Sequence, residues 1–152
     1  LVEGENIQYD PIPLFPPEHF CRVIADDPSR RKQFAKALEL LQQEGAIQIF
    51  WPLDEGSRIP IMGAVGQLQF EVVAHRLRTD YGVEAKFEPL SFRLARWIVG
   101  SEEELEKFEP SRLAVRVQDG QGRLVCLFPS QWDLDYTVEK NPALQFSAVS
   151  PR

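Results

Sequence analysis

A chain of 152 residues is long enough to bury a core, either as one medium domain or as two small lobes packed together. Its 43% hydrophobic and 26% charged residues are ordinary for a globular protein, and no run approaches the roughly 18 apolar residues of a membrane-spanning helix. With 17 basic and 23 acidic residues the formal net charge is −6, so any contact with an anionic partner has to be local.

The chain begins with a proline-rich segment. "DPIPLFPPEHF", residues 10–20, holds four of the twelve prolines. Because proline fixes φ and removes a backbone donor, this composition favours an extended strap over a helix. The sequence also has no initiator Met and no signal peptide. Residues 1–17 are therefore predicted to be a linker from a preceding domain that is absent here.

Residues 18–89 show the pattern of a strand, a helix, two strands, a helix and a strand. Alternating residues 19–27 predict the first strand, and Asp27, Pro28 and Gly45 mark the ends of the first helix. This βαββαβ order predicts an α+β, ferredoxin-like lobe with two helices on one face of a four-stranded antiparallel sheet. The remaining elements are expected at residues 46–52, 59–65, 66–82 and 83–90.

Residues 90–152 repeat this pattern less regularly and predict a second, smaller α/β lobe of similar type. A strand at residues 92–99 precedes a short helix, in which Ser101 and Glu104 are spaced as a capping box. A hairpin is predicted around Asp119-Gly120. A helix at residues 129–142 and a strand at 144–149 complete the lobe, but the pattern does not fix the order of its strands.

"PIMGAVGQLQFEVVAHRL", residues 60–77, has the strand–turn–helix layout of a phosphate-binding loop. Gly66 is followed by neither the lysine nor the hydroxyl of a nucleotide loop, and Glu71 stands where an acylphosphatase-like loop would need arginine. Gly63 and Gly66 are instead expected to permit a tight turn and close packing. Glu71 and His75 form a solvated pair on the helix, and no catalytic or metal site is predicted.

The sequence offers two groups of cations that suit an anionic partner. The first group opens the first helix, where cations are unfavourable and Asp26 and Asp27 offset part of the cost. The second group alternates with Phe92 and Trp97, which is compatible with RNA contact. A solvated surface is the alternative for the first group, and arginine stems lying on a sheet face are the alternative for the second. The candidate residues are Arg30, Arg31, Lys32, Arg93 and Arg96.

Cys21 and Cys126 are too few for a disulfide framework and have no metal-ligand spacing with the histidines. Both lie in predicted strands, where buried, unreactive thiols are the usual case. A cytoplasmic protein with reduced thiols is expected.

A long ordered series of residues resembles one known family. "PIMGAVGQLQFEVVAHRLRTDYGVEAKFEPLSFRLARW" is similar to the C-terminal domain of bacterial peptide chain release factor 3, including "GAVGQLQFEVV", "YGVEA" and "ARW". "FPPEHFCRV", "DPSRRKQFAKALELLQQEGAIQIF" and "NPALQF" fit the same family in order, whereas residues 52–60 and most of 101–140 diverge. The first lobe also resembles the third domain of elongation factor G.

The resemblance implies that the intact protein is a translational GTPase that binds the ribosome after peptide release and drives off the class I release factor. It places a GTPase domain and a β-barrel domain before Leu1, with GTP and magnesium bound there. This chain is then expected to hold no cofactor and to dock on RNA and protein of the small ribosomal subunit. Its other implied partners are its own preceding domains and, indirectly, class I release factors, with no membrane. The resemblance assigns no contact residues, so the five cations rest on charge alone.

Two other classes of function compete with this interpretation. One is a small phosphate-handling enzyme of acylphosphatase-like type on a ferredoxin-like fold, which would need the missing loop arginine. The other is a small-molecule sensor of the ACT type, which would have a glycine-rich dimer interface at the first strand-to-helix turn. That turn reads "ADDPSRR" here, acidic and then basic.

Overall fold

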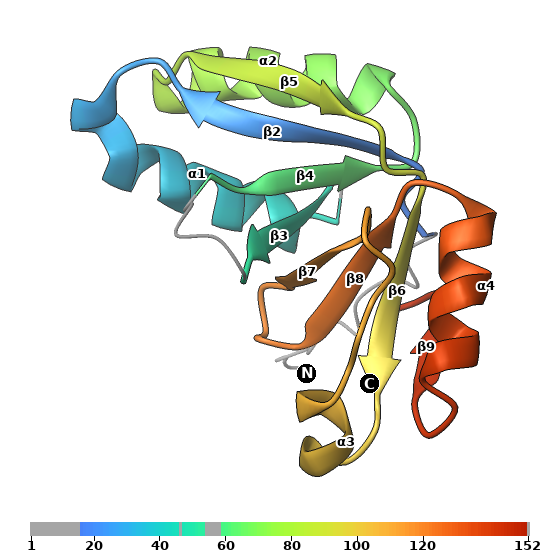
Figure 1. Cartoon of the computed structure of the whole chain (residues 1–152). Helices are drawn as coiled ribbons and strands as arrows, with labels where there is room; N and C mark the ends of the chain where they lie inside the picture. Colours follow the sequence, from blue (N-terminus) through green and yellow to red (C-terminus); the bar gives the residue numbers. More distant parts are fainter. Residues whose placement is uncertain (1–15, 46, 54–58, 152) are drawn as a thin grey trace, which may run out of the picture.

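The computed structural model (Figure 1) describes residues 16–45, 47–53 and 59–151. The expected strap therefore lies outside the described residues except at its end, where Pro17 is buried. The expected turn at residues 54–58 lies outside them as well. Among the described helices, none has both the length and the apolar character needed to cross a membrane.

The first half of the chain folds in the predicted order of elements. Asp27 caps the first helical turn with its side chain, and Gly45 and Gly82 end the two long helices with φ of 83° and 66°. The second helix starts at Leu68, two residues after the predicted Gly66. The elements are β2 (His19–Ala25), η1 (Pro28–Arg30), α1 (Arg31–Gln43), β3 (Gln48–Pro52), β4 (Ile61–Ala64), α2 (Leu68–Tyr81) and β5 (Ala85–Leu90).

The second half also contains every predicted element. Ser101 and Glu104 form the predicted capping box, with Glu104 N 3.1 Å from Ser101 Oγ. The hairpin expected around Asp119-Gly120 is present, and its residue with a positive φ, 82°, is Gly122. The Asp119 carboxylate accepts hydrogen bonds from the backbone N–H groups of Gln121 and Arg123 on either side of this glycine. The elements are β6 (Leu94–Val99), α3 (Glu102–Glu106), β7 (Val115–Gln118), β8 (Leu124–Phe128), α4 (Gln131–Lys140) and β9 (Gln145–Ser147).

The eight strands of the described residues belong to one sheet in the order β5-β2-β4-β3-β7-β8-β6-β9, and every neighbouring pair is antiparallel. The first four strands have the order of a ferredoxin-like lobe, which confirms the predicted α+β fold class. The last four repeat that order from the opposite edge, which the sequence pattern did not fix. The halves join where Trp51 pairs with Gln118 and Pro52 pairs with Val117.

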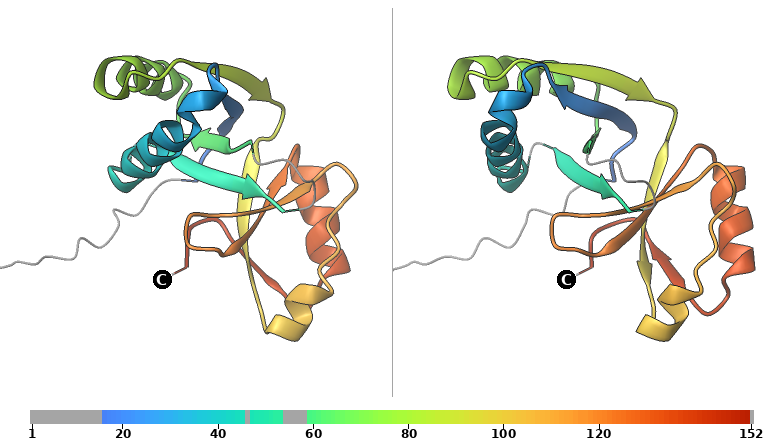
Figure 2. Two further views of the ribbon diagram at one scale, coloured as in Figure 1. Left: turned by 90° about the vertical axis from the view of Figure 1, so that its left-hand side faces the viewer. Right: turned by 60° about the vertical axis from the view of Figure 1, so that its left-hand side comes forward.

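The two half-sheets turn their helix-free faces toward each other, and their helices lie on the outside (Figure 2). Three apolar clusters result, one beneath the helices of each half and a central cluster between the half-sheets. Rings from both halves meet there, since the Phe50 and Trp97 centroids are 6.1 Å apart. The central cluster consists of Phe20, Phe50, Ile61, Ala95, Trp97, Val117, Val125 and Leu127.

The inner side of α4 and its C-cap is partly polar. Asp133, Thr137 and Asn141 are buried there at four-residue intervals. The Asn141 amide donates to Glu109 O at 3.0 Å and accepts from Glu109 N at 3.1 Å. Thr137 Oγ1 accepts from Ser111 N at 2.9 Å. These bonds fasten the connection between α3 and β7 onto α4, because each satisfies a backbone group that would otherwise lack a partner.

Candidate interaction surface

The two glycines for which a structural role was predicted are Gly63, within β4, and Gly66, in the turn before α2. A Cβ at Gly63 would lie 3.0 Å from Pro17 Cβ, 3.1 Å from the Phe50 ring and 3.2 Å from the Phe20 ring. A side chain at Gly63 would therefore crowd Pro17 and the two rings, which is consistent with a packing role for this glycine. Gly66 has no heavy atom within 4 Å of such a Cβ and no left-handed φ. The expected steric reason for glycine is thus wrong at Gly66, because the turn is open to solvent there.

The turn between β4 and α2, residues 65–67, carries neither a cation nor a hydroxyl side chain that could hold a phosphate. The Val65 N–H donates to Gln69 Oε1 at 3.2 Å, and no side chain caps α2. Glu71 and His75 are both exposed on this helix. In the described residues, no group of three or more His, Cys, Asp or Glu side chains could hold a metal ion. Cys21 is buried in the first outer cluster, and burial raises its pKa to about 12.

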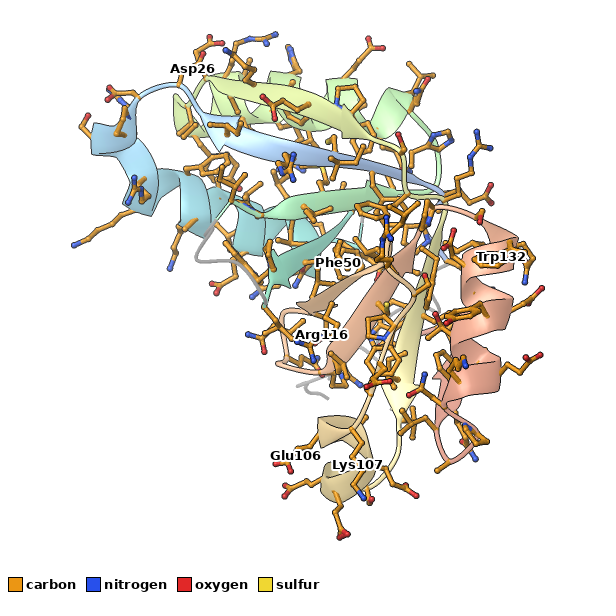
Figure 3. All side chains as sticks on the ribbon, viewed as in Figure 1. Asp26, Phe50, Glu106, Lys107, Arg116 and Trp132 are labelled. Atoms are coloured by element: carbon orange, nitrogen blue, oxygen red, sulfur yellow. The ribbon has the colours of Figure 1, made fainter. Side chains whose placement is uncertain are left out.

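The first group of candidate cations lies at the free end of the first lobe. Arg30, Arg31 and Lys32 are exposed, and Figure 3 labels Asp26 at this end of the molecule. Arg30 Nη1 donates to Gly82 O at 3.3 Å, which places a cation at the C-terminal end of α2, where the helix dipole favours it. The side chains of Arg31 and Lys32 make no hydrogen bond or ion pair with other described residues, so their charges are available to a partner.

The second group lies in the other lobe and is divided. Arg93 is exposed just before β6, whereas Arg96 is half-buried between β6 and α4, where burial lowers the pKa of its guanidinium. The neighbouring aromatic residues are not available for stacking with bases. Phe92 packs edge-on against Phe20, and Trp97 is buried with Nε1 donating to Asp119 Oδ2 at 3.0 Å. The five candidate cations therefore form no single patch.

Two exposed apolar features were missing from the sequence analysis. Val65, Leu68 and Val72 surround the open turn before α2 and are 44%, 72% and 53% exposed. On α4, Trp132 and Tyr136 are 67% and 40% exposed, and their rings stack with centroids 5.3 Å apart. The spacing of apolar residues does not predict which side of α4 is buried, because its buried side is partly polar and its large aromatic residues face solvent.

These observations define the class of protein. It is an α+β module made of two ferredoxin-like halves on one sheet, and its candidate functional residues are exposed cations and exposed apolar side chains. A family model described as "Class II release factor RF3, C-terminal domain" matches residues 9–138. The chain belongs to this family, and the acylphosphatase-like alternative is not favoured.

Curated relatives named "Peptide chain release factor 3" agree with this assignment. The relative from Microcystis aeruginosa is 45% identical over 151 residues, 99% of this chain and 28% of the relative. The one from Synechocystis sp. is 48% identical over 147 residues, 97% of this chain and 27% of the relative. The one from Gloeobacter violaceus is 44% identical over 149 residues, 97% of this chain and 28% of the relative. The chain thus spans a little over a quarter of the length of these relatives.

Proposed function

We propose that this chain is the non-catalytic, ribosome-docking domain of a translational GTPase that acts in the cytoplasm during translation termination. In this role the intact protein promotes dissociation of class I release factors from the ribosome. The observation that carries the proposal is the family match over residues 9–138. GTP and magnesium would be bound by a preceding domain, not by these residues.

The continuous sheet supports a mechanical role for the domain. Pairing of β3 with β7 and the central cluster join the two halves, so a force applied to one half is transmitted to the other. We propose residues 18–89 and 90–152 as the two structural lobes, with residues 1–17 as the linker to the preceding domains. A rigid body of this kind suits a domain that relays the nucleotide state between a GTPase domain and the small ribosomal subunit.

The RNA-facing part of the surface is proposed at the start of α1. Arg31 and Lys32 are exposed and have no partner among the described residues, and exposed Lys36 lies one turn beyond Lys32. Cations at this spacing on a helix can contact successive phosphates of an RNA backbone. Arg30 contributes charge but also binds Gly82 O. Exposed Arg93 would be a separate, peripheral contact, and Arg96 is the least accessible of the candidates.

Charge reversal in the full-length protein tests this proposal. Arg31→Glu with Lys32→Glu should weaken ribosome binding and make it less dependent on salt. The log–log slope of affinity against salt should fall by about one unit for each phosphate that is no longer neutralised. Lys107→Glu with Arg112→Glu, which reverses two exposed cations of the second half, is a charge-matched control that should bind normally. Unchanged affinity in the double variant would refute the RNA contact.

The docking role itself needs a second measurement. Deleting this domain from the full-length protein should abolish ribosome-dependent GTP hydrolysis and release-factor dissociation while leaving GTP binding intact. The isolated chain should show no GTP binding by calorimetry. Retained release-factor dissociation after the deletion, or GTP binding by the isolated chain, would contradict the proposal.

A further inference from the structure

We propose that the outer face of α4 is a docking site for a basic protein segment that presents arginine or lysine side chains. The site consists of Trp132, Asp135, Tyr136 and Glu139, together with the hollow beside them. It lies in the second lobe, whereas the main RNA contact is proposed at the start of α1 in the first lobe. It therefore does not depend on the proposed ribosome-docking function and is tested separately from it.

The aromatic pair is the central feature of this site. Trp132 is 67% exposed, and its ring lies nearly parallel to Tyr136, with an interplanar angle of 13°. Figure 3 labels Trp132 on the outward side of α4. An apolar ring of this size loses the favourable free energy of burial when it stays in water. An exposed stacked pair on the solvent side of a helix is instead suited to covering by a partner.

The same pair already accepts a cation from its own helix. Lys140 Nζ lies 5.6 Å from the centroid of the Tyr136 ring, within the range of a cation–π interaction. Trp132 presents the stronger cation-binding ring, and among the described residues the only ring stacked on it is that of Tyr136. A guanidinium or ammonium group from a partner would therefore find an electron-rich surface at Trp132.

Two carboxylates flank the rings. Asp135 and Glu139 are exposed, and each follows one of the aromatic residues by three positions, which puts them side by side on the helix surface. Asp135 Oδ1 accepts from Gln131 Nε2 at 2.9 Å. The Glu139 carboxylate has no hydrogen bond or ion pair with any other described residue. These carboxylates can pair with the cations of a basic segment at the edge of the aromatic surface.

A hollow of about 340 Å³ adjoins the carboxylates between α4 and the edge of the sheet. Leu134, Val138 and Phe146 form its apolar lining, and Asp135, Glu139 and Arg96 supply its charged groups. Within the described residues, no nitrogen of Arg96 comes within 4.0 Å of either carboxylate. Two acids against one base leave the hollow net negative. The apolar stem and charged head of an arginine or lysine match this combination.

Charge decides between a protein and a nucleic acid as the occupant. Exposed aromatic rings can also stack on unpaired bases, but RNA would bring phosphates close to Asp135 and Glu139. Like charges at that distance disfavour binding, whereas the cations of a basic protein segment are attracted. The aromatic rings and the carboxylates thus favour the same partner.

Titration of peptides into the 152-residue chain tests the site. The probe is a capped twelve-residue peptide of alternating Arg and Gly, with Lys–Gly and Glu–Gly peptides of the same length for comparison. Binding is followed by calorimetry and by Trp fluorescence. We expect the Arg peptide to bind, the Lys peptide to bind less tightly and the Glu peptide not to bind, because a guanidinium stacks on indole and forms bidentate bonds with carboxylates.

Variants locate the binding on α4. Trp132→Ala should weaken the Arg peptide about 3- to 30-fold. Asp135→Asn with Glu139→Gln should weaken it at least about 3-fold. Glu102→Gln with Glu103→Gln removes the same charge from exposed positions of α3 and should have less than about 2-fold effect. All substituted side chains are exposed, and circular dichroism checks that each variant remains folded.

Several outcomes would overturn the proposal. One is failure of the Arg peptide to bind at millimolar concentration. Another is that the α3 control variant weakens binding of the Arg peptide as much as the α4 variant does, because the effect would then come from the overall charge of the chain. A third is Trp132-dependent binding of an oligouridine RNA in place of the Arg peptide, which would assign the rings to nucleic acid. Trp132-dependent dimerisation in sedimentation experiments would assign the face to a second copy of the chain.

Discussion

Replacing Phe50 with alanine tests whether the two halves of the sheet form one cooperative unit. Phe50 belongs to β3 of the first half, is 0% exposed, and has its ring centroid 6.4 Å from Phe20 and 6.1 Å from Trp97 of the second half. Loss of a fully buried phenylalanine costs about 3–5 kcal/mol, since the cavity left behind adds to the lost transfer free energy. For a chain of this size the melting temperature should fall by roughly 6–20 °C.

Hydrogen exchange gives the decisive measurement, because it reports the two halves separately. If the central cluster couples them, Phe50→Ala lowers the protection of amides in β4 and in β8 by the same factor, roughly a thousandfold for 4 kcal/mol. Gln43→Ala, an exposed change on α1, should leave both strands unchanged. Loss of protection in β4 with full protection retained in β8 would refute the reasoning, since the halves would then unfold independently.

Four further predictions follow from single contacts. Gly63→Ala should lower the free energy of unfolding by about 1–3 kcal/mol through crowding in the core, and a neutral result in urea unfolding would contradict this. Asn141→Ala leaves the part-buried backbone N–H and C=O of Glu109 without these partners and should cost about 1–3 kcal/mol in the same assay, whereas an unchanged midpoint would show that the two bonds are dispensable. The hydrogen bond from Arg76 lowers the pKa of Glu44 below its ordinary value of 4.5. The stability that this bond adds is therefore complete above pH 4.5, and it is lost as the pH falls through the lowered pKa of Glu44 in the folded protein. The difference in melting temperature between wild type and Arg76→Ala should therefore shrink below about pH 4.5, and a constant difference would count against the ion pair. Cys21 is buried, and burial raises its pKa to about 12, so the native thiol should resist alkylation at pH 8 and react only through unfolding, and rapid labelling located by mass spectrometry would contradict its burial.

The first half of the fold could be predicted because its signals are local. Asp27, Gly45 and Gly82 act within one turn of their own helices, so their effects can be read from neighbouring residues. Alternation over residues 83–87, leading into β5, likewise separates buried Val83 and half-buried Phe87 from exposed Glu84 without knowledge of any partner. The resemblance to a known family added function, which none of these local signals contains.

The candidate surface was harder to predict, since exposure depends on what packs nearby. Arg93 and Arg96 are three residues apart in the sequence, yet one is exposed and the other lies partly beneath α4. Gly66 reads like Gly63 in the sequence, but only Gly63 is surrounded by Pro17 and aromatic rings from other strands. In α4 the buried Thr137 looks like a surface residue until its bond to the α3–β7 connection is seen.

By itself, the sequence determined the elements, their order, the caps, the ferredoxin-like character of the first lobe and the family. Each depends on spacing and on residue types that act over a few positions along the chain. Tertiary structure alone decided that β3 pairs with β7, that the helix-free faces share a central cluster, and that Trp132 and Tyr136 face solvent. These features arise between segments distant in the sequence, where packing and backbone hydrogen bonding across the whole sheet outweigh local preference.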